Sequence, residues 1–242
     1  MEIWAHRGCS VKFPENTLPA FEAAMNISGL TGIELDVQLS KDEVPVVIHD
    51  EKIDRTTNRI GFVKDLSFTD LKEIGNIPSL EEVLNLLAPK LKEGLLLNIE
   101  LKTSVFPYQG IEEKVVELVD KFEVADSIIY SSFNSESTKK ILKLRPNAKA
   151  AALGKTGLDC LNDANFNIHC SAVHPYIRSM NIDKFALDNL DLCVRVWTKD
   201  LFYPHGYLPI KHNLVKLESK GITGIFVNDP ERYLEEKKNG IL

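Results

Sequence analysis

The chain has 242 residues, of which 44% are hydrophobic and 26% are charged, and its formal net charge is −6. A chain of this length buries a core without disulfides, and scattered basic residues on an acidic protein argue against a nucleic-acid-binding surface. No stretch reaches the roughly 18 consecutive apolar residues of a membrane-spanning helix, so we expect no stable membrane insertion.

Short apolar or alternating runs recur along the chain, separated by segments with helical spacing. The predicted strands are Glu2–Ala5, Gly32–Leu39, Val44–Ile48, Leu95–Leu101, Ser127–Ser131, Lys149–Leu153, Ser171–His174, Leu192–Trp197 and Gly224–Val227. The predicted helices are Thr17–Ser28, Ser79–Leu87, Ile111–Phe122, Ser135–Leu144, Ile182–Asn189, Leu214–Ser219 and a short one from Pro230. Strands that alternate with helices predict parallel pairing in a sheet covered by helices.

The number of predicted strands is typical of one architecture. About eight of them favour a closed (β/α)8 TIM barrel, an α/β fold, over an open doubly wound sheet. Neither G-x-G-x-x-G nor G-x-x-x-x-G-K-[ST] follows the first strand, which removes the main sign of a nucleotide-binding fold. We therefore predict a single barrel domain over residues 1–242.

One segment interrupts this alternation of strands and helices. Residues 51–78 are polar and rich in turn formers, with one short helical patch at Thr69–Ile74. We expect a small insertion at the barrel rim, after the second strand region. Capping signals mark the helices on either side: Thr17 is a predicted N-cap, and Ser79 forms a predicted capping box with Glu82.

Acidic side chains recur on one face of two predicted strands. Alternation places Glu34 and Asp36 on one side of the strand Gly32–Leu39, and Glu100 on the corresponding side of the strand Leu95–Leu101. Carboxylates roughly 7 Å apart on a packed inner face repel each other and are costly to desolvate, and a bound cation removes both problems. Oxygen ligands without histidine or cysteine predict Mg²⁺ or Ca²⁺. A half-exposed antiparallel sheet would show the same alternation and remains an alternative.

Two histidines directly follow predicted strands. His6 follows the run IWA and His49 follows VPVVI, so in a barrel both would lie at the carboxyl-end rim. Imidazole titrates near neutral pH, which suits such a pair to general base and acid roles. Arg7 and Lys102 supply local positive charge suited to phosphate oxygens. Structural histidines, and salt bridges to the neighbouring carboxylates, are the alternatives.

The cysteines and the N-terminal sequence bear on the cellular compartment. Cys9, Cys160, Cys170 and Cys193 lack C-x-x-C or zinc-like spacing, so we expect free thiols packed as small apolar residues. The start MEIWAHRG has none of the segments of a signal peptide, which makes the cytoplasm the expected location.

Taken together, these motifs resemble those of the glycerophosphodiester phosphodiesterase family, and the likeness extends over Ile3–Tyr233. In chain order they are AHRG, PENT, IELDVQLSKDEVPVVIHD, RTTN, IPSLEEVL, NIELK, SSFN, VRVWT and GITGIFVNDPE. The combination of HRG, PENT, ELD, HD and IELK is specific to that family. The resemblance implies a TIM barrel with a small insertion after the second histidine, in agreement with the position of residues 51–78.

The resemblance also implies roles for individual residues. They are the metal ligands Glu34, Asp36 and Glu100, the acid–base pair His6 and His49, and the phosphate contacts Arg7 and Lys102. In the implied reaction a glycerol hydroxyl attacks phosphorus, one histidine removes its proton, the other protonates the leaving alcohol, and water then opens a cyclic phosphate. We expect His6 to be the first base and His49 the first acid. Asn16 is expected to order the site, although capping of the following helix explains it equally well.

The sequence departs from the family pattern in its last quarter. Where relatives commonly read W-T-V-N, this chain reads WTKD from Trp197, followed by the loop LFYPHGYLPI at residues 201–210. Trp197 is expected either to line the pocket for glycerol or the alcohol, or to pack in the core. The loop is placed to act as a lid, an alcohol-binding element or a subunit contact, so it leaves substrate choice open.

The expected function is metal-dependent hydrolysis of small glycerophosphodiesters to glycerol 3-phosphate and an alcohol. The alternatives are the same machinery acting on lysophospholipids and, less favoured, a silent barrel that binds phosphate esters. An amidohydrolase-type barrel would need an H-x-H zinc pair, which the sequence lacks. The sequence does not indicate the alcohol, the choice between Mg²⁺ and Ca²⁺, or the oligomeric state.

Overall fold

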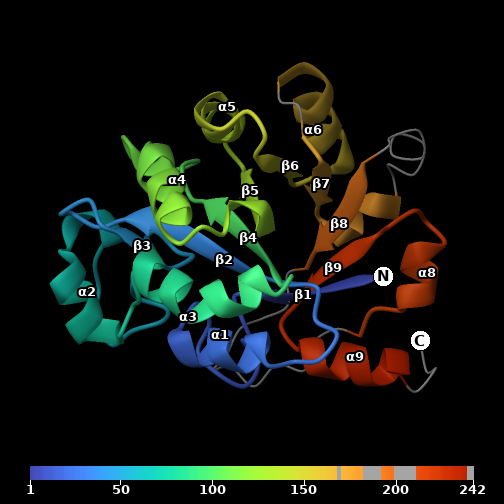
Figure 1. Ribbon diagram of the computed structural model, residues 1–242, viewed down its shortest axis with the longest axis horizontal. Coiled ribbons are helices and arrows are strands. Elements are labelled where there is room, and N and C mark those ends of the chain that lie inside the picture. The colour runs from blue at the N-terminus through green and yellow to red at the C-terminus, as the bar shows by residue number, and fades with distance from the viewer. Residues whose placement is uncertain (168–169, 182–191, 199–210, 239–242) are drawn as a thin grey trace.

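The computed structural model describes residues 1–167, 170–181, 192–198 and 211–238. Its strands are β1 (Glu2–His6), β2 (Gly32–Leu39), β3 (Pro45–Val47), β4 (Leu96–Leu101), β5 (Ile128–Ser132), β6 (Lys149–Gly154), β7 (Ala172–Pro175), β8 (Cys193–Trp197) and β9 (Gly224–Val227). Eight of them pair in parallel in the order β1–β9–β8–β7–β6–β5–β4–β2, and the pairing of β1 with β2 closes the ring. With helices around this ring (Figure 1), the chain adopts the predicted (β/α)8 TIM barrel.

β3 corrects one of the strand predictions. The run Val44–Ile48 is predicted as a parallel barrel strand, but β3 pairs antiparallel with the end of β2 and lies outside the ring. Leu39 pairs with Pro45, so the connection is a short hairpin loop. A parallel pair would need a crossover of about a dozen residues or more, which this spacing does not provide.

The helices are α1 (Leu18–Met25), α2 (Phe68–Gly75), α3 (Leu80–Lys92), α4 (Ile111–Lys121), α5 (Ser135–Leu144), α6 (Gly157–Asn162), α8 (Leu214–Glu218) and α9 (Pro230–Lys238). The predicted caps are present, because Thr17 accepts a hydrogen bond from the backbone of Ala20 and Ser79 forms its capping box with Glu82. None of the described helices combines the length and the apolar character needed to span a bilayer.

Two helices differ from the prediction. α3 continues beyond Leu87 and through Pro89 to Lys92, because Leu91 in its last turn is buried against the core. α6 is missing from the prediction, since six residues are too short for a helical period to stand out. The predicted helix Ile182–Asn189 lies outside the described residues, as does the 201–210 loop. All four cysteines are free: Cys9 and Cys160 are buried, and Cys170 and Cys193 are half-buried.

The apolar face of the barrel strands points outward and packs against the helices. Ile33, Leu35 and Val37 of β2 are fully buried in the same cluster as Phe21 of α1 and Leu84 of α3. Burial of each such side chain contributes about 1.5–3 kcal/mol relative to exposure. Since this face is apolar, the alternating polar residues of β2 are directed to the inside of the barrel.

The amino-terminal end of the barrel interior is filled. Glu2 accepts hydrogen bonds from Arg195 Nε at 2.5 Å and from Trp4 Nε1 at 3.0 Å. The ring of Trp4 also packs against that of Phe226, with their centroids 5.6 Å apart. The interior therefore supports a site at the carboxyl ends of the strands rather than a channel.

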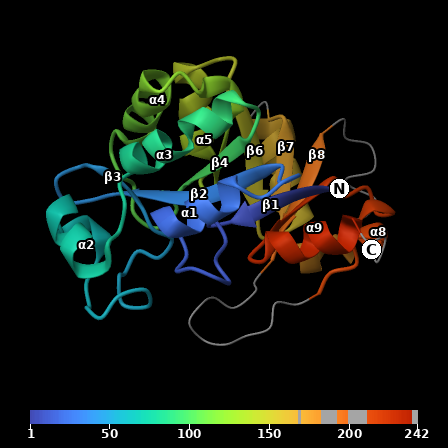
Figure 2. The same ribbon diagram turned by 60° about the horizontal axis from the view of Figure 1, so that its bottom comes forward.

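Residues 51–78 lie between β3 and α3 and pack on a small core of their own. Ile53, Val63 and Leu71 are fully buried in a cluster that also contains Val46 and Ile48. Figures 1 and 2 both place α2 at the edge of the molecule next to β3, away from the ring. The segment thus supports the hairpin arm that leads to His49.

Gly32 is required by the packing of Trp4. A Cβ atom at Gly32 would lie 2.3 Å from Trp4 Cζ3 and 2.8 Å from the carbonyl oxygen of Leu96. A buried ring and a backbone atom cannot easily move aside to make room for a methyl group. We therefore expect Gly32→Ala to lower the free energy of unfolding by about 1–3 kcal/mol in urea denaturation. Gly61→Ala, whose nearest neighbour would be Leu66 Cδ1 at 3.7 Å, should not destabilise the protein. Equal losses in both variants would contradict this explanation.

Candidate active site

Parallel pairing places polar residues of different strands side by side. In the register of β2 with β4, Asp36 is level with Glu100 and Glu34 with Asn98. On the other edge of β2, His6 of β1 is level with Glu34. These side chains share the inner face near the carboxyl ends of the strands, so the register gathers them at one point of the barrel mouth.

Three carboxylates form the centre of this group. Glu34, Asp36 and Glu100 each offer an oxygen within 4.8 Å of the others; the first two are buried, and the side chain of Glu100 is 12% exposed. Asn16 Nδ2 donates to Asp36 Oδ2 at 2.9 Å, and Lys102 Nζ donates to Glu100 Oε1 at 2.8 Å. Oxygen ligands at this spacing fit a hard divalent cation.

The loop after β1 has an unusual backbone that serves this cluster. Arg7 and Asn16 adopt left-handed conformations, with φ of 58° and 57°, and the Asn16 N–H donates to the Arg7 carbonyl at 3.1 Å. The Arg7 N–H in turn donates to Glu34 Oε2 at 3.0 Å. Left-handed non-glycine residues concentrate where function requires a particular geometry. Since Thr17 caps α1, the Asn16 amide serves Asp36 instead of the helix.

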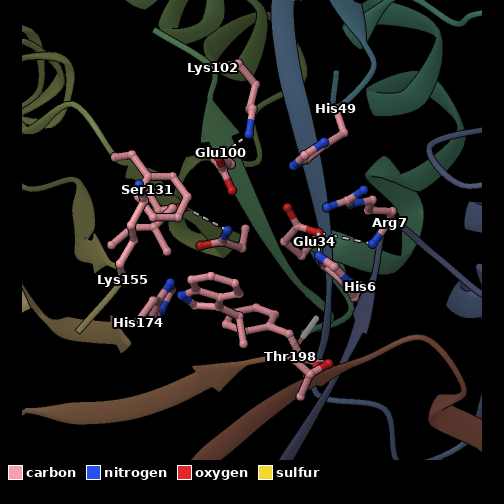
Figure 3. Close-up of a pocket in the computed structure, with 15 residues that line it drawn as sticks. His6, Arg7, Glu34, His49, Glu100, Lys102, Ser131, Lys155, His174 and Thr198 are labelled. Carbon is pink, nitrogen blue, oxygen red and sulfur yellow. Dashed lines mark hydrogen bonds and ion pairs between the residues drawn. The ribbon is translucent and has the colours of Figure 1, made fainter. Parts of the chain in front are cut away.

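Each histidine is held through its Nδ1 atom. His6 Nδ1 lies 2.8 Å from Oδ1 of Asn228, just after β9, and His49 Nδ1 lies 2.6 Å from Asp50 Oδ1. An oxygen acceptor at Nδ1 places the proton of a neutral ring there and leaves Nε2 with its lone pair. In the view of Figure 3 the two rings lie on either side of Glu34, and His6 Nε2 is 3.8 Å from Glu34 Oε2.

His49 reaches the barrel mouth by a different route from the predicted one. It follows the antiparallel β3, which folds back along β2, and does not end a barrel strand. Gln38 Nε2 lies 2.8–3.2 Å from the carbonyl oxygens of Ile48, His49 and Asp50. Gln38 Oε1 accepts a hydrogen bond from the Tyr108 hydroxyl at 2.8 Å. These bonds fix the backbone of the histidine segment where the strand ladder has ended.

The carboxylate cluster opens onto a cavity of about 610 Å³ (Figure 3). Its lining consists of His6, Arg7, Glu34, His49, Asn98, Glu100, Lys102, Ser131, Phe133, Leu153, Lys155, His174, Trp197, Thr198 and Phe226. Trp197 stacks on Tyr176 with ring centroids 4.6 Å apart and donates from Nε1 to the Gly154 carbonyl at 3.1 Å. It therefore presents an anchored aromatic side chain to the cavity.

Comparison with known proteins agrees with this geometry. The model of the glycerophosphoryl diester phosphodiesterase family matches residues 6–232. The chain belongs to this family. A glycerophosphodiester phosphodiesterase of Bacillus altitudinis is 38% identical over 249 residues, covering 97% of both chains. One of Caldanaerobacter subterraneus is 34% identical over 253 residues, covering 98% of both. As a member, the protein is a phosphodiesterase, which is a class of hydrolase.

Solved phosphodiesterase structures share the fold. One from Parabacteroides distasonis superposes with a TM-score of 0.78 at 21% identity, covering 100% of this chain and 98% of that one. A phosphodiesterase of Oleispira antarctica, solved with the product sn-glycerol-3-phosphate, gives 0.77 at 24% identity, covering 98% and 97%. These likenesses establish the shared barrel.

The charges of the candidate site affect its two buried carboxylates in opposite ways. Burial and the neighbouring Asp36 raise the pKa of Glu34 well above its usual range. Burial alone would also raise the pKa of Asp36, but the charges of His49, Arg7 and Lys102 outweigh it and hold that pKa well below its usual range. Glu34 is thus the carboxylate that most lacks a positive partner.

His6 lies in a different electrostatic environment. Burial, followed by the nearby charge of Arg7, lowers the pKa of His6 to about 3. The ring is therefore neutral at physiological pH. With Asn228 at Nδ1, its Nε2 lone pair is suited to accept a proton.

Several residues of the site were not assigned a role from the sequence. Asp50 and Asn228 orient the histidines, while Glu15 and Arg55 pair with each other. All four lie within motifs used for the family resemblance, PENT, HD, RTTN and VND. The sequence motifs therefore contain these residues. Their contacts are not predicted, because they join loops that lie far apart in the sequence.

The raised pKa of Glu34 leads to a test on the metal-free protein. In EDTA at pH 7 we expect Glu34→Gln to stabilise the protein by about 0.5–2 kcal/mol, because the amide removes repulsion within the cluster. As the pH rises above the usual carboxyl value of about 4.3, the unfolded chain releases this proton before the folded one, so folding becomes less favourable. The gain should therefore vanish near pH 4.

Thermal and urea denaturation at the two pH values measure this effect. Glu22→Gln, at an exposed position of α1, is the matched control and should change little at either pH. An equal gain at both pH values, or a loss at pH 7, would contradict the assigned repulsion.

Proposed function

We propose that this protein hydrolyses glycerophosphodiesters to glycerol 3-phosphate and an alcohol, with one divalent cation, Mg²⁺ or Ca²⁺, held by Glu34, Asp36 and Glu100. The observation that carries the proposal is the carboxylate cluster, whose oxygens lie within 4.8 Å of one another beside two anchored imidazoles. The membership of the family supports the reaction type.

The residues present fit such a cation. Asp36 Oδ1 is buried and accepts no hydrogen bond from the described residues, and burial together with the neighbouring Asp36 raises the pKa of Glu34. Both features are those of ligands arranged for an ion. When bound, the cation would act as a Lewis acid toward the phosphoryl oxygens and the attacking hydroxyl.

Two basic residues are placed to bind the phosphate. The side chains of Arg7 and Lys102 line the cavity, and their ion pairs with Asp36 and Glu100 hold them beside the cluster. The phosphodiesterase of Oleispira antarctica was solved with sn-glycerol-3-phosphate, and we propose the same product for this chain. Asn16 would keep Asp36 in place while phosphate is bound.

The histidines would divide the proton transfers between them. His6, neutral and with Nε2 unprotonated, would remove the proton of the attacking glycerol hydroxyl. His49, held by Asp50 Oδ1 at 2.6 Å from its Nδ1, would donate a proton to the leaving alcohol. Water would then open the resulting cyclic phosphate with the two roles exchanged.

A second candidate substrate class is favoured by the apolar part of the cavity lining. Phe133, Leu153, Trp197 and Phe226 contribute apolar side chains to it, which suits an alcohol with an apolar body. Lysophospholipids carry such a group and would be cleaved by the same machinery.

Activity and metal dependence are tested together. We expect purified protein to release glycerol 3-phosphate from glycerophosphocholine, to lose this activity in EDTA, and to regain it with Mg²⁺ or Ca²⁺. Glu100→Gln should lower kcat/KM by at least about 100-fold, because a charged ligand is lost. A coupled assay for glycerol 3-phosphate measures each rate.

Glu22→Gln is the control and should keep the rate of the parent. Activity that persists in EDTA would contradict the metal-dependent proposal. Binding of glycerophosphocholine without turnover would favour the phosphate-binding alternative, and faster turnover of lysophosphatidylcholine would favour the lysophospholipid one.

The roles of the histidines are separable by changing the leaving group. With glycerophosphocholine, His6→Ala and His49→Ala should each slow release of the alcohol by about 10²–10⁴-fold. With a p-nitrophenyl ester of glycerol phosphate, whose leaving group needs no proton, His49→Ala should recover to within about tenfold of the parent, whereas His6→Ala should not. Release in the first turnover is the quantity to measure. Recovery of His6→Ala instead would reverse the assignment.

A further inference from the structure

Charged side chains of alternating sign connect His49 to the carboxylate cluster. Asp50, which holds His49, accepts from Arg55 Nε at 2.6 Å, and both terminal nitrogens of Arg55 donate to Glu15 at 2.7 Å. Arg7 Nη1 donates to Glu15 Oε1 at 2.8 Å. Arg7 Nε then lies 3.3 Å from Asp36 Oδ2. The chain of contacts thus runs from one proposed acid–base group to the proposed metal ligands.

Arg55 is the member that joins two otherwise separate parts of the site. It belongs to the segment 51–78, whereas Glu15 belongs to the loop after β1, 40 residues earlier. Three of its nitrogens are engaged at once, two in a fork on Glu15 and one on Asp50. A planar guanidinium holds such partners at fixed angles, which a lysine ammonium cannot do.

Burial makes this arrangement sensitive to loss of any member. The side chain of Glu15 is 3% exposed and that of Arg7 is 5% exposed, while Arg55 is 27% exposed. Without Arg55, the buried Glu15 keeps one guanidinium instead of two, and Asp50 loses its tether on the side away from His49. Both Arg7 and His49 would then have more than one accessible orientation.

We propose that Arg55, acting through Glu15 and Asp50, is a positioning residue that sets Arg7 and His49 relative to each other. The inference rests on the proposed function, because it assigns Arg7 to phosphate binding and His49 to proton transfer. It gives the segment 51–78 a part in catalysis although Arg55 itself need not touch the substrate.

Kinetics of paired variants test the proposal. Arg55→Ala and Glu15→Gln should each lower kcat for glycerophosphocholine about 10–100-fold, the range typical of residues that orient catalytic groups. The double variant should be no slower than the slower single one, because both changes break the same connection. Arg55→Lys should restore little, since it keeps the charge but loses the fork. Arg59→Ala, an exposed arginine of the same segment, should match the parent.

A spectroscopic readout keeps the test independent of activity and of simple loss of folding. In ¹⁵N-histidine-labelled protein, at a pH high enough for the ring to be neutral, His49 should show the Nδ1–H tautomer in the parent and a mixture of tautomers in Arg55→Ala, at unchanged overall fold by circular dichroism. If the parent hydrolyses no substrate, the proposed function fails, yet this spectrum still decides the positioning role. Parent-like kcat and His49 signals in Arg55→Ala, or full activity in Arg55→Lys, would overturn the proposal.

Discussion

Hydrogen bonding between β2 and β4 holds acidic side chains close together although their charges repel each other. The ladder makes Asp36 level with Glu100, and the two-residue period of β2 puts Glu34 on the same inner face. A shift of β2 by one residue in this register would send Glu34 and Asp36 to the outer, helix-covered face, where Ile33 and Leu35 are now buried. The apolar packing of the barrel thus enforces a crowded acidic centre, and the rest of the site is arranged around that constraint.

The surrounding charges compensate this centre in part. The ion-paired network around it contains five carboxylates and three permanently basic groups: Glu15, Glu34, Asp36, Asp50 and Glu100, against Arg7, Arg55 and Lys102. Counted over these eight side chains alone, the formal charge is −2, and a bound divalent cation would offset it. Burial and the charge of Asp36 raise the pKa of Glu34, whereas the charges beside Asp36, Arg7 and Lys102 among them, hold the pKa of that carboxyl low.

The sequence predicts this centre well because the information is local. Alternation within two short strands is enough to align Glu34, Asp36 and Glu100, since parallel strands of a barrel share one inner face. The direction of β3 is harder to predict, because an apolar run has the same pattern in a parallel and in an antiparallel strand. The short loop before β3 is what makes its pairing with β2 antiparallel. Glu15 and Arg55 meet across 40 residues of chain, so no period or cap signals their contact. Local patterns therefore identify the three carboxylates, whereas the residues that hold them in place depend on tertiary contacts.

The antiparallel hairpin arm explains how one barrel provides two unlike imidazoles. A barrel strand delivers side chains at its own end, as β1 does for His6, whose side chain is 11% exposed and has its pKa lowered by burial. A second histidine at the end of a neighbouring strand would share that buried environment, which would favour the neutral form of that ring too. By folding β3 back over β2, the chain brings His49 in from the solvent side, 30% exposed and paired with a carboxylate. Burial thus favours the neutral form of His6, whereas His49 reaches the site partly exposed, with a carboxylate at its Nδ1.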